Sequence, residues 1–508
     1  MTAIRQRYER LEAARQPFLD RARDASKLTI PSLLPPDGHS AHSKLYTPFQ
    51  GIGARGVNNL SSKMLLALLP PNSPFFRLTV DDFKLQELAQ EEGARAEVEE
   101  ALSKIERAVM SEIEASSTRI AAFEAIKHLL VAGNVLLYQP DKGGMRVFHL
   151  DRYVLKRDPM GNPLEIITKE DVSPSALPEE IRDLLETSDE DTSQDEPVAL
   201  FTHVIRRDGK WNVSQEVSGI PVPDATGTYP LDKSPWIPLR LSRIDGESYG
   251  RGYVEEYQGD LNSLETLTQA IVEAAAASAK VLFLVRPNGT TRARVLAEAP
   301  NGAIREGDAN DVSTLQVQKS GDMQIAFQSS QEIKERLSFA FLMNSSVQRK
   351  AERVTAEEIR YMASELEDAL GGIYSILSQE FQLPLVNRLL LQMQKQKKVP
   401  QLPKGLVSPT IVTGLEALGR GHDLNKLAAM LEHLAPLGPE AIQKYMNIGD
   451  YITRVGTSLG MDMDGLIKSE EEMQQEEQQA MMMQTGQQLA PQAFDAMKEY
   501  TQAPQGNE

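Results

Sequence analysis

The 508-residue sequence contains no cysteine, which excludes a disulfide scaffold, a thiol nucleophile and zinc sites built from thiolates. It also lacks any run of about 20 apolar residues, the length that spans a bilayer, and its first residues lack the apolar core of a signal peptide. Positive charge is scarce: 54 Lys and Arg stand against 72 Asp and Glu, and a net charge of −18 argues against a protein that simply coats nucleic acid. We therefore expect a chain made in a reducing cytosol that does not associate with membranes.

The common motifs of nucleotide binding and catalysis are missing too. The sequence has no G-x-x-x-x-G-K-[ST] loop, no G-x-G-x-x-G after a predicted strand and no G-x-S-x-G elbow. GESYGRG, from Gly246, has no βαβ context and is interpreted as a tight turn rather than a phosphate cradle. A zinc site at His39 and His42 lacks a carboxylate constellation. His422 beside Asp423 fits a helix cap better than acid–base chemistry. We expect no enzymatic activity, no cofactor and no metal.

What is present is a large apolar fraction with clear periodicity. With 41% hydrophobic residues the chain can bury a core, and its length fits several domains or one large elongated subunit. Spacings of three and four predict mostly helical structure over 1–135. Pro70 and Pro71 are expected to stop one helix, another covers about 98–115, and a third ends near Gly133. The first helix carries four apolar residues on one side: Tyr8, Leu11, Phe18 and Ala22.

From residue 134 the pattern changes to short β-rich runs separated by turn signals. The segments 141–144 and 158–162 are predicted hairpin turns, and strands are expected again at VALFTHVIRR and KWNVSQEV, ending near Leu241. Between them, 173–197 contains nine acidic residues and one basic residue, which predicts a short helix and a solvated loop.

Two predicted helices then flank a small β-rich insertion, an order that describes a rod with a tip. One apolar stripe of about seven turns runs along 253–279 and ends in alanines with a single serine, which permits close approach of a neighbouring helix. A β-rich, glycine- and asparagine-punctuated segment covers 280–328. The second helix is predicted to begin at Ser329, where Ser329 and Glu332 form a capping box.

The polar, basic stretch NSSVQRKAER then leads into a long helix with another capping box, Thr355 and Glu358. Gly371 and Gly372 loosen this helix at a cost of about 1 kcal/mol each relative to alanine. Pro384 is expected to kink or end it.

Several of these stretches resemble one family. SYGRGYVEEYQGDLNSLETL, RVTAEEIR…DALGGIYSILSQEFQLPLVNR and GLEALGRGHDLNKL, in this order around the rod-and-tip pattern, are similar to the portal protein (head-to-tail connector) of short-tailed phages, in particular autographivirus-type podoviruses. The resemblance covers roughly residues 1–460. It implies an α+β, mainly helical fold and an elongated subunit, twelve of which form a ring at one capsid vertex. Double-stranded DNA would pass through the central channel during packaging and ejection.

The resemblance also implies a division of the chain. The expected regions are the wing at 1–252 and 354–405, the stem helices at 253–279 and 329–343, the clip at 280–328, the tunnel loop at 344–353, the crown bundle at 406–460 and a Gln/Met-rich tail at 461–508 that is partly helical or disordered. In such a ring the glycine pair and Pro384 would let the long helix bend.

The implied partners are those of a capsid vertex. They are further copies of the chain in a homo-dodecamer, double-stranded DNA in the channel, the large terminase during packaging, the tail adaptor protein, the major capsid protein, the scaffolding protein and internal core proteins at the crown. The protein would be made in the host cytoplasm and end in the virion.

Three groups of residues are candidates for these contacts. The small residues Ala274, Ala275 and Ser278 are expected to pack between stems of neighbouring subunits. Four bases in the clip offer charge to acidic partners: Arg286, Arg292, Arg294 and Arg305. Three bases in the tunnel loop would form a positive girdle that touches phosphates without reading sequence: Arg349, Lys350 and Arg353. Residues 280–353 contain eleven bases and eight acids, so positive charge concentrates there in an otherwise acidic chain.

Two alternatives remain open. One is another ring-forming virion protein such as a tail adaptor, which the long rod with its small tip disfavours. The other is an intracellular nucleic-acid enzyme, which the missing motifs disfavour.

Overall fold

The computed structural model describes residues 4–40, 42–71, 74–80, 94–182, 197–278, 282–315, 320–343, 370–402, 407–411, 419–438, 446 and 448–458. The chain divides into two units, of which the first comprises Met1–Lys84 and Lys104–Leu415 and the second Leu85–Ser103 and Glu416–Glu508. Each is considered by itself.

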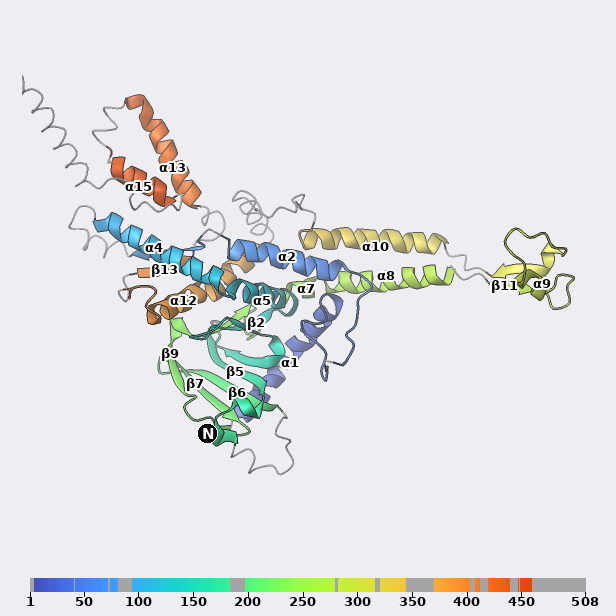
Figure 1. Ribbon diagram of the computed structural model, residues 1–508, viewed down its shortest axis with the longest axis horizontal. Helices are drawn as coiled ribbons and strands as arrows, with labels where there is room; N and C mark the ends of the chain where they lie inside the picture. The colour runs from blue at the N-terminus through green and yellow to red at the C-terminus, as the bar shows by residue number, and fades with distance from the viewer. Residues whose placement is uncertain are drawn as a thin grey trace, which may run out of the picture. The chain divides into compact units, whose positions relative to one another are not determined.

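Figure 1 labels the main elements. The helices are α1 (Ile4–Leu28), α2 (Ile52–Leu68), α4 (Ala94–Ala115), α5 (Thr118–Ala132), α7 (Tyr253–Glu256), α8 (Gln258–Ser278), α9 (Ala293–Ala297), α10 (Ser320–Ala340), α12 (Leu383–Lys395), α13 (Gly419–Leu434) and α15 (Ile448–Ser458). The strands are β1 (Phe76–Val80), β2 (Asn134–Tyr138), β3 (Arg146–Phe148), β4 (Tyr153–Arg157), β5 (Pro163–Val172), β6 (Val198–Arg207), β7 (Lys210–Val217), β8 (Ile220–Pro221), β9 (Gly227–Pro230), β10 (Trp236–Arg240), β11 (Leu282–Val285), β12 (Val312–Leu315) and β13 (Val407–Ile411). Shorter turns include the 3₁₀ turn η1 (Leu150–Arg152) and the π-helical turn η5 (Ser378–Gln382).

The α+β composition and most of the predicted order are confirmed. β4 to β8 form an antiparallel meander in chain order, with β9 added against β7, and β10, β2 and β3 form a second sheet. Both predicted turns join paired strands, β2 to β3 and β4 to β5. α2 ends before Pro70, and Gly133 closes α5 with φ +73°, a conformation that suits glycine.

α1 covers the β-rich part of the first unit with the side that its sequence predicts. Tyr8, Leu19 and Ala22 are buried, while Leu11 and Phe18 are partly buried against the same clusters. The opposing core comes from the two sheets and includes Leu136, Tyr153, Ile166, Val204, Trp211 and Trp236. Since these residues come from strands on both sides of the 158–162 turn, α1 and the sheets form one continuous core.

Two strands that were not predicted, β1 and β13, pair antiparallel from Phe76 opposite Ile411 to Val80 opposite Val407. Each strand is five residues long, and β13 contains Pro409, which argues against a strand except at an edge. Because the partners lie far apart in the chain, no hairpin turn marks the pair. β13 therefore belongs to the first unit, although the predicted crown began at residue 406.

The predicted start of the second rod helix at Ser329 is wrong, because α10 already begins at Ser320. Ser329, the predicted cap, therefore lies in the interior of α10. A serine and a glutamate three residues apart also occur inside helices, so the capping-box spacing of Ser329 and Glu332 does not mark a helix start here. The β-rich insertion is correspondingly shorter than 280–328. The other rod helix is interrupted at Tyr257, whose N–H donates to the Val254 carbonyl between α7 and α8.

Pro384 neither ends nor sharply interrupts the long helix, of which the described part is 370–395. Proline lacks the N–H that an α-helix needs at its position. Here the π-helical turn η5 absorbs the mismatch just before it, and Pro384 occupies the first turn of α12. Gly371 and Gly372 lie in the helical part, whereas the predicted capping box at Thr355 and Glu358 lies outside the described residues.

In the second unit, α13 and α15 confirm helices in the predicted crown region. The predicted tail at 461–508 lies outside the described residues.

Candidate ring, channel and docking elements

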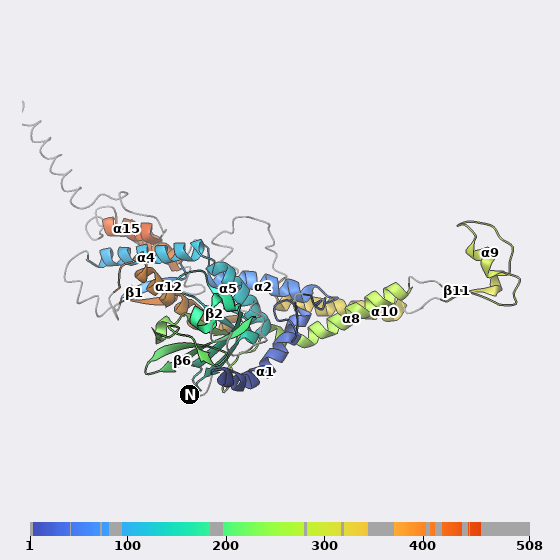
Figure 2. The same ribbon diagram turned by 60° about the horizontal axis from the view of Figure 1, so that its bottom comes forward.

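α8 and α10 lie side by side in both views and are called the helix pair here (Figures 1 and 2). At its base, Tyr253, Tyr257 and Phe341 form an aromatic cluster with ring centroids 5.2 to 5.9 Å apart. Burial raises the pKa of Tyr253 above its ordinary value. Gly56 of α2 lies against this cluster, since a Cβ there would come within 2.6 Å of the Phe341 ring. The base is therefore packed tightly enough to require glycine on α2.

The C-terminal end of α10 is capped by side chains from other helices. Tyr253 donates to the Ala340 carbonyl at 2.8 Å. Asn59 donates to the carbonyls of Phe341 and Leu342, and Lys63 to that of Leu342, at 2.9 to 3.0 Å. Helix ends leave carbonyls without partners, and a cation there also meets the negative end of the helix dipole.

A buried carboxylate fixes a loop to the start of α8. Glu265 accepts hydrogen bonds from the Tyr46 hydroxyl at 2.5 Å and from the N–H groups of Phe49 and Gln50 at 2.9 and 3.2 Å. The hydrogen bond to Glu265 raises the pKa of Tyr46. Three hydrogen bonds to one carboxylate thus join the loop before α2 to the first turns of α8.

Away from this base the helix pair is exposed. α8 buries only Leu261, Leu264 and Glu265, and Val272 is 51% exposed. Of the predicted contact residues, Ala275 is exposed, while Ala274 and Ser278 are half-buried. α10 exposes three large apolar side chains: Ile325, Phe327 and Phe339.

Residues 282–315, called the hairpin segment here, are held together by polar contacts. β11 and β12 pair antiparallel. Asp311, the residue before β12, accepts from the Thr291 N–H and the Thr290 hydroxyl at 3.1 Å. The Thr291 N–H bond is the main cause that lowers the pKa of Asp311. Gly289 is needed here, because a Cβ would lie 2.4 Å from the Asp311 carboxylate. This segment has a polar centre and leaves its apolar side chains outside.

The four predicted docking arginines all lie in the hairpin segment and all are exposed. Arg294 pairs with Glu298 one turn along α9 at 2.9 Å, and both side chains are more than half exposed. Arg286 contributes to the lowered pKa of Asp311. The side chains of Arg292 and Arg305 have no hydrogen bond or ion pair to another described residue. The structure thus gives two of the four a role inside the segment.

Comparison with known proteins bears on these elements. The family model for bacteriophage head to tail connecting protein matches residues 1–467. The chain belongs to this family of phage head-to-tail connecting proteins. The portal protein of Escherichia phage T7 is 46% identical over 471 residues, covering 91% of this chain and 88% of that protein, and the portal protein of Enterobacteria phage T3 is 45% identical over 470 residues with the same coverage. The resemblance to autographivirus-type portal proteins is confirmed.

A solved structure of the neck of a native GTA particle aligns with 80% of this chain and 89% of its own at 12% identity, with a TM-score of 0.33. That likeness is too low to add to the sequence match. The match to portal proteins over 91% of the chain decides against the tail-adaptor alternative and assigns the chain to a family of structural portal proteins rather than to a family of enzymes.

The three predicted tunnel-loop bases of this portal protein lie outside the described residues. The described chain stops at Met343, three residues after α10, and resumes at Leu370. Sequence reasoning did not identify Asn59 and Lys63, which hold the chain just before this stretch. Their spacing of four on α2 puts both polar side chains on one face, which is the signal that could have revealed them.

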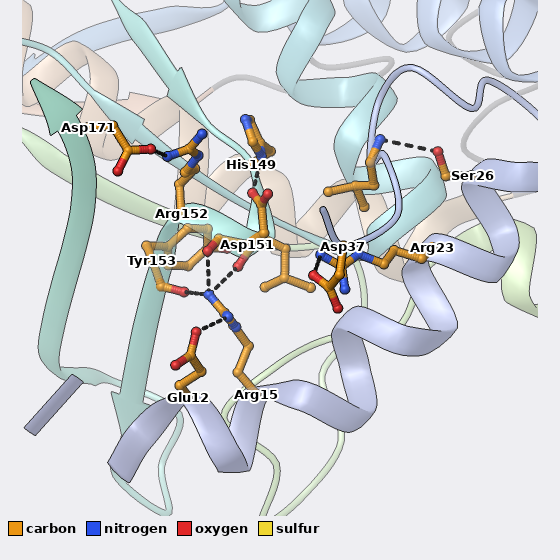
Figure 3. A network of polar contacts seen from close by, with 12 residues as sticks. Glu12, Arg15, Arg23, Ser26, Asp37, His149, Asp151, Arg152, Tyr153 and Asp171 are labelled. Atoms are coloured by element: carbon orange, nitrogen blue, oxygen red, sulfur yellow. Dashed lines mark hydrogen bonds and ion pairs between the residues drawn. The ribbon is translucent and has the colours of Figure 1, made fainter. Parts of the chain in front are cut away.

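The part of the first unit built from α1, α5 and the two sheets, called the sheet body here, is held together by buried arginines. In Figure 3 the Arg15 guanidinium donates to the carbonyls of Asp151 and Tyr153, at 2.7 and 3.1 Å, and pairs with Glu12. The adjacent His149–Asp151 and Arg152–Asp171 contacts extend the network. Arg15 is 2% exposed, so it fastens α1 to the η1 turn from inside the core.

A second arginine cluster joins the sheets of the sheet body to the π-helical turn. Arg240 donates to Glu380 at 2.9 Å, and Arg157 lies 3.7 Å from the same carboxylate. Burial lowers the pKa of Arg157 to about 10. Gly161 has φ +89° and lies so close that a Cβ would approach Arg240 to 2.5 Å. Two buried guanidinium groups thus share one carboxylate, which anchors η5 and with it the helix that leads out of the undescribed stretch.

A polar cavity of about 470 Å³ adjoins the network of Figure 3 and includes His128, which is 2% exposed. Burial lowers the pKa of His128 to about 4, so the ring is neutral at pH 7. In the parts of the chain that the structure describes, no group of three His, Asp or Glu residues is placed to hold a metal ion. Within the same residues, no helix has the length and apolarity needed to cross a membrane.

Proposed function

We propose that this portal protein forms a twelve-subunit ring at one capsid vertex, with a central channel through which double-stranded DNA is packaged and ejected. The observation that supports this most is the exposure of large apolar side chains along the helix pair and the hairpin segment. Scattered exposed apolar residues are ordinary, but groups of them mark protein contacts. In a ring these side chains would be covered by the neighbouring subunits.

The mass of the purified assembly tests the ring. Native mass spectrometry should give a closed oligomer of this 56.3 kDa chain, with twelve copies as the main species. Replacing Ala275 with leucine should reduce the ring, because overpacking a close helix contact costs about 1–3 kcal/mol per site. The matched control is Gly259→Ala on the same helix, where an added Cβ meets nothing within 4 Å. A wild-type protein that remains monomeric at micromolar concentration contradicts the ring.

The hairpin segment is proposed to be the clip, which would dock the large terminase during packaging and the tail adaptor afterwards. Arg292 and Arg305 support this, because each is exposed and its side chain has no hydrogen bond or ion pair to the described residues around it. Reversing the charge at Arg292 should weaken binding of an acidic partner, and the loss of affinity should be larger at low salt, where the charges are less screened. Reversal at Arg294 is the comparison, since that residue pairs with Glu298. Unchanged terminase and adaptor binding in both variants contradicts docking through these bases.

The stretch that follows Met343 is proposed to contain the tunnel loop, with Arg349, Lys350 and Arg353 facing DNA. Three bases per subunit would contact phosphates without sequence preference and would keep packaged DNA from slipping back. Substituting all three with alanine should leave ring assembly unchanged but yield heads that lose DNA. Stable, filled heads from the triple variant contradict this role. The major capsid, scaffolding and internal core proteins are proposed to contact the wing and crown.

A further inference from the structure

α2 makes contacts at both ends of the connection between α10 and the long helix. Before the connection, Asn59 and Lys63 bind the last carbonyls of α10. After it, Tyr374 donates to the Ala67 carbonyl and Gln382 to the Leu68 carbonyl, each at 2.6 Å. Asn59 and Lys63 are spaced by four, so their side chains lie on one face of α2. The carbonyls of Ala67 and Leu68 lie at the C-terminal end of the same helix. One helix thus contacts the chain on both sides of the connection.

The sequence of α2 explains why its own end is available for these contacts. In a continuing helix the Ala67 carbonyl would accept from the N–H of residue 71. Residues 70 and 71 are both proline and have no N–H, so this carbonyl needs another donor. Tyr374, which is 8% exposed, supplies it. The prolines that end α2 thus create the docking point for the long helix.

The contacts on the α10 side are equally buried. Lys63 is 7% exposed, and Gln382 on the other side has no exposed surface. Leu342 has φ +52°, a left-handed conformation that a leucine adopts only at a cost. The carbonyls of Phe341 and Leu342 face Asn59 and Lys63 in this conformation, which supports a backbone held by its caps.

We propose that α2 is a clamp that fixes both ends of residues 344–369, called the channel segment here, with Lys63 and Tyr374 as its positioning residues. The clamp rests on the proposed function only for the identity of the segment between its two ends. By holding Leu342 and Tyr374 relative to one helix, α2 sets where that segment stands in the channel. A change of hold at either end therefore alters the contact with DNA without altering the surfaces that join subunits.

Three single variants test this clamp in the full-length protein. Lys63→Met removes the ammonium but keeps the length of the side chain, and Tyr374→Phe removes one hydroxyl. Ser62→Ala is the matched control, because the Ser62 hydroxyl is exposed and, among the described residues, bonds only to the Asn58 carbonyl of its own helix. Hydrogen exchange of 337–343 and 374–382, native mass spectrometry of the ring, and the DNA content of heads assembled with each variant are the readouts.

Lys63→Met should raise exchange at 337–343 about tenfold, as expected for loss of a hydrogen bond to a charged group. Tyr374→Phe should do the same, less strongly, at 374–382. Both should form rings of normal mass but retain less DNA, and Ser62→Ala should match the wild type. Unchanged exchange at both ends overturns the clamp. Raised exchange with normal DNA retention overturns its link to the channel.

If Lys63→Met fails to fold, Tyr374→Phe decides alone, since one hydroxyl is lost from a chain otherwise intact. If wild-type rings form but never retain DNA, the proposed channel function has failed, and the exchange measurements still judge the clamp.

Discussion

Aromatic side chains are buried at the base of the helix pair but exposed in the hairpin segment. At the base, Phe341 has no exposed surface and contacts a glycine on α2, whereas in the hairpin segment Phe283 is 66% exposed. Phe283 and Leu284 are adjacent in β11, so they point to opposite faces of a two-stranded sheet, and both are exposed. The base is complete within one subunit, whereas the hairpin segment has exposed apolar surface on both faces.

The largest effect is expected at the base. Phe341→Ala should lower the free energy of unfolding by about 3–5 kcal/mol, because it removes a fully buried ring from a cluster that cannot collapse around the gap. Urea unfolding followed by fluorescence or circular dichroism measures this change.

Phe339→Ala is the matched control on the same helix, since Phe339 is 75% exposed. It should change subunit stability by less than about 0.5 kcal/mol. Similar losses for the two variants would break the comparison, because the base would then be no more self-contained than the rest of α10.

Different pH dependence is expected for the sheet body and for the hairpin segment. Because burial lowers the pKa of His128 from 6.5 in the unfolded chain to about 4, the folded state binds fewer protons between these values. The stability of the sheet body is therefore complete well above pH 6.5 and declines as the pH falls, by about 1–2 kcal/mol between pH 6.5 and 5. In the hairpin segment, the lowered pKa of Asp311 keeps its carboxylate ionised over this range.

His128→Phe should flatten the decline, as measured by urea unfolding at pH 6.5 and 5. Exchange rates in 282–315, corrected for the intrinsic pH dependence, should change equally in wild type and variant. A wild-type decline that the variant reproduces would assign the pH dependence to other groups.

The sequence predicted what depends on local pattern. The stripe of α1, the stop at Pro70 and the two hairpin turns all follow from spacing or from residues with one preferred conformation. The rod with a tip was also predicted, because two helical patterns enclose a run of β-formers. These signals need only neighbouring residues.

What the sequence did not predict depends on residues distant in the chain. β1 and β13 pair only in the folded protein, and Ser329 resembles a cap although it lies within α10. The contacts of Lys63 with Leu342 and of Glu380 with Arg240 join segments that no local pattern relates. These long-range polar contacts could not be predicted from the sequence, whereas the positive charge of Arg349, Lys350 and Arg353 is evident from it.

A smaller, local effect is expected from Gly289→Ala in the hairpin segment. The new Cβ would lie 2.4 Å from the Asp311 carboxylate, which must then rotate away from Thr291. Exchange of the β11 amides should rise about fivefold, a local change of about 1 kcal/mol, while the unfolding midpoint of the sheet body stays constant. A shifted midpoint of the sheet body would show that the two regions are not independent.

The smallest effect on the subunit, and the sharpest test of the comparison, is expected from Phe283→Ser. Since the Phe283 side chain is 66% exposed, its loss removes little buried surface within one chain, and subunit stability should change by less than about 0.5 kcal/mol. If neighbouring subunits cover this side chain, the same change removes apolar contact at every interface of the assembly. The protein concentration needed to form the oligomeric ring should then rise. Phe283→Leu retains most of the apolar surface and should assemble like the wild type. Native mass spectrometry across a dilution series measures the assembly. Equal ring fractions for the serine variant and the wild type at every concentration would show that this exposed face is not covered by a second copy.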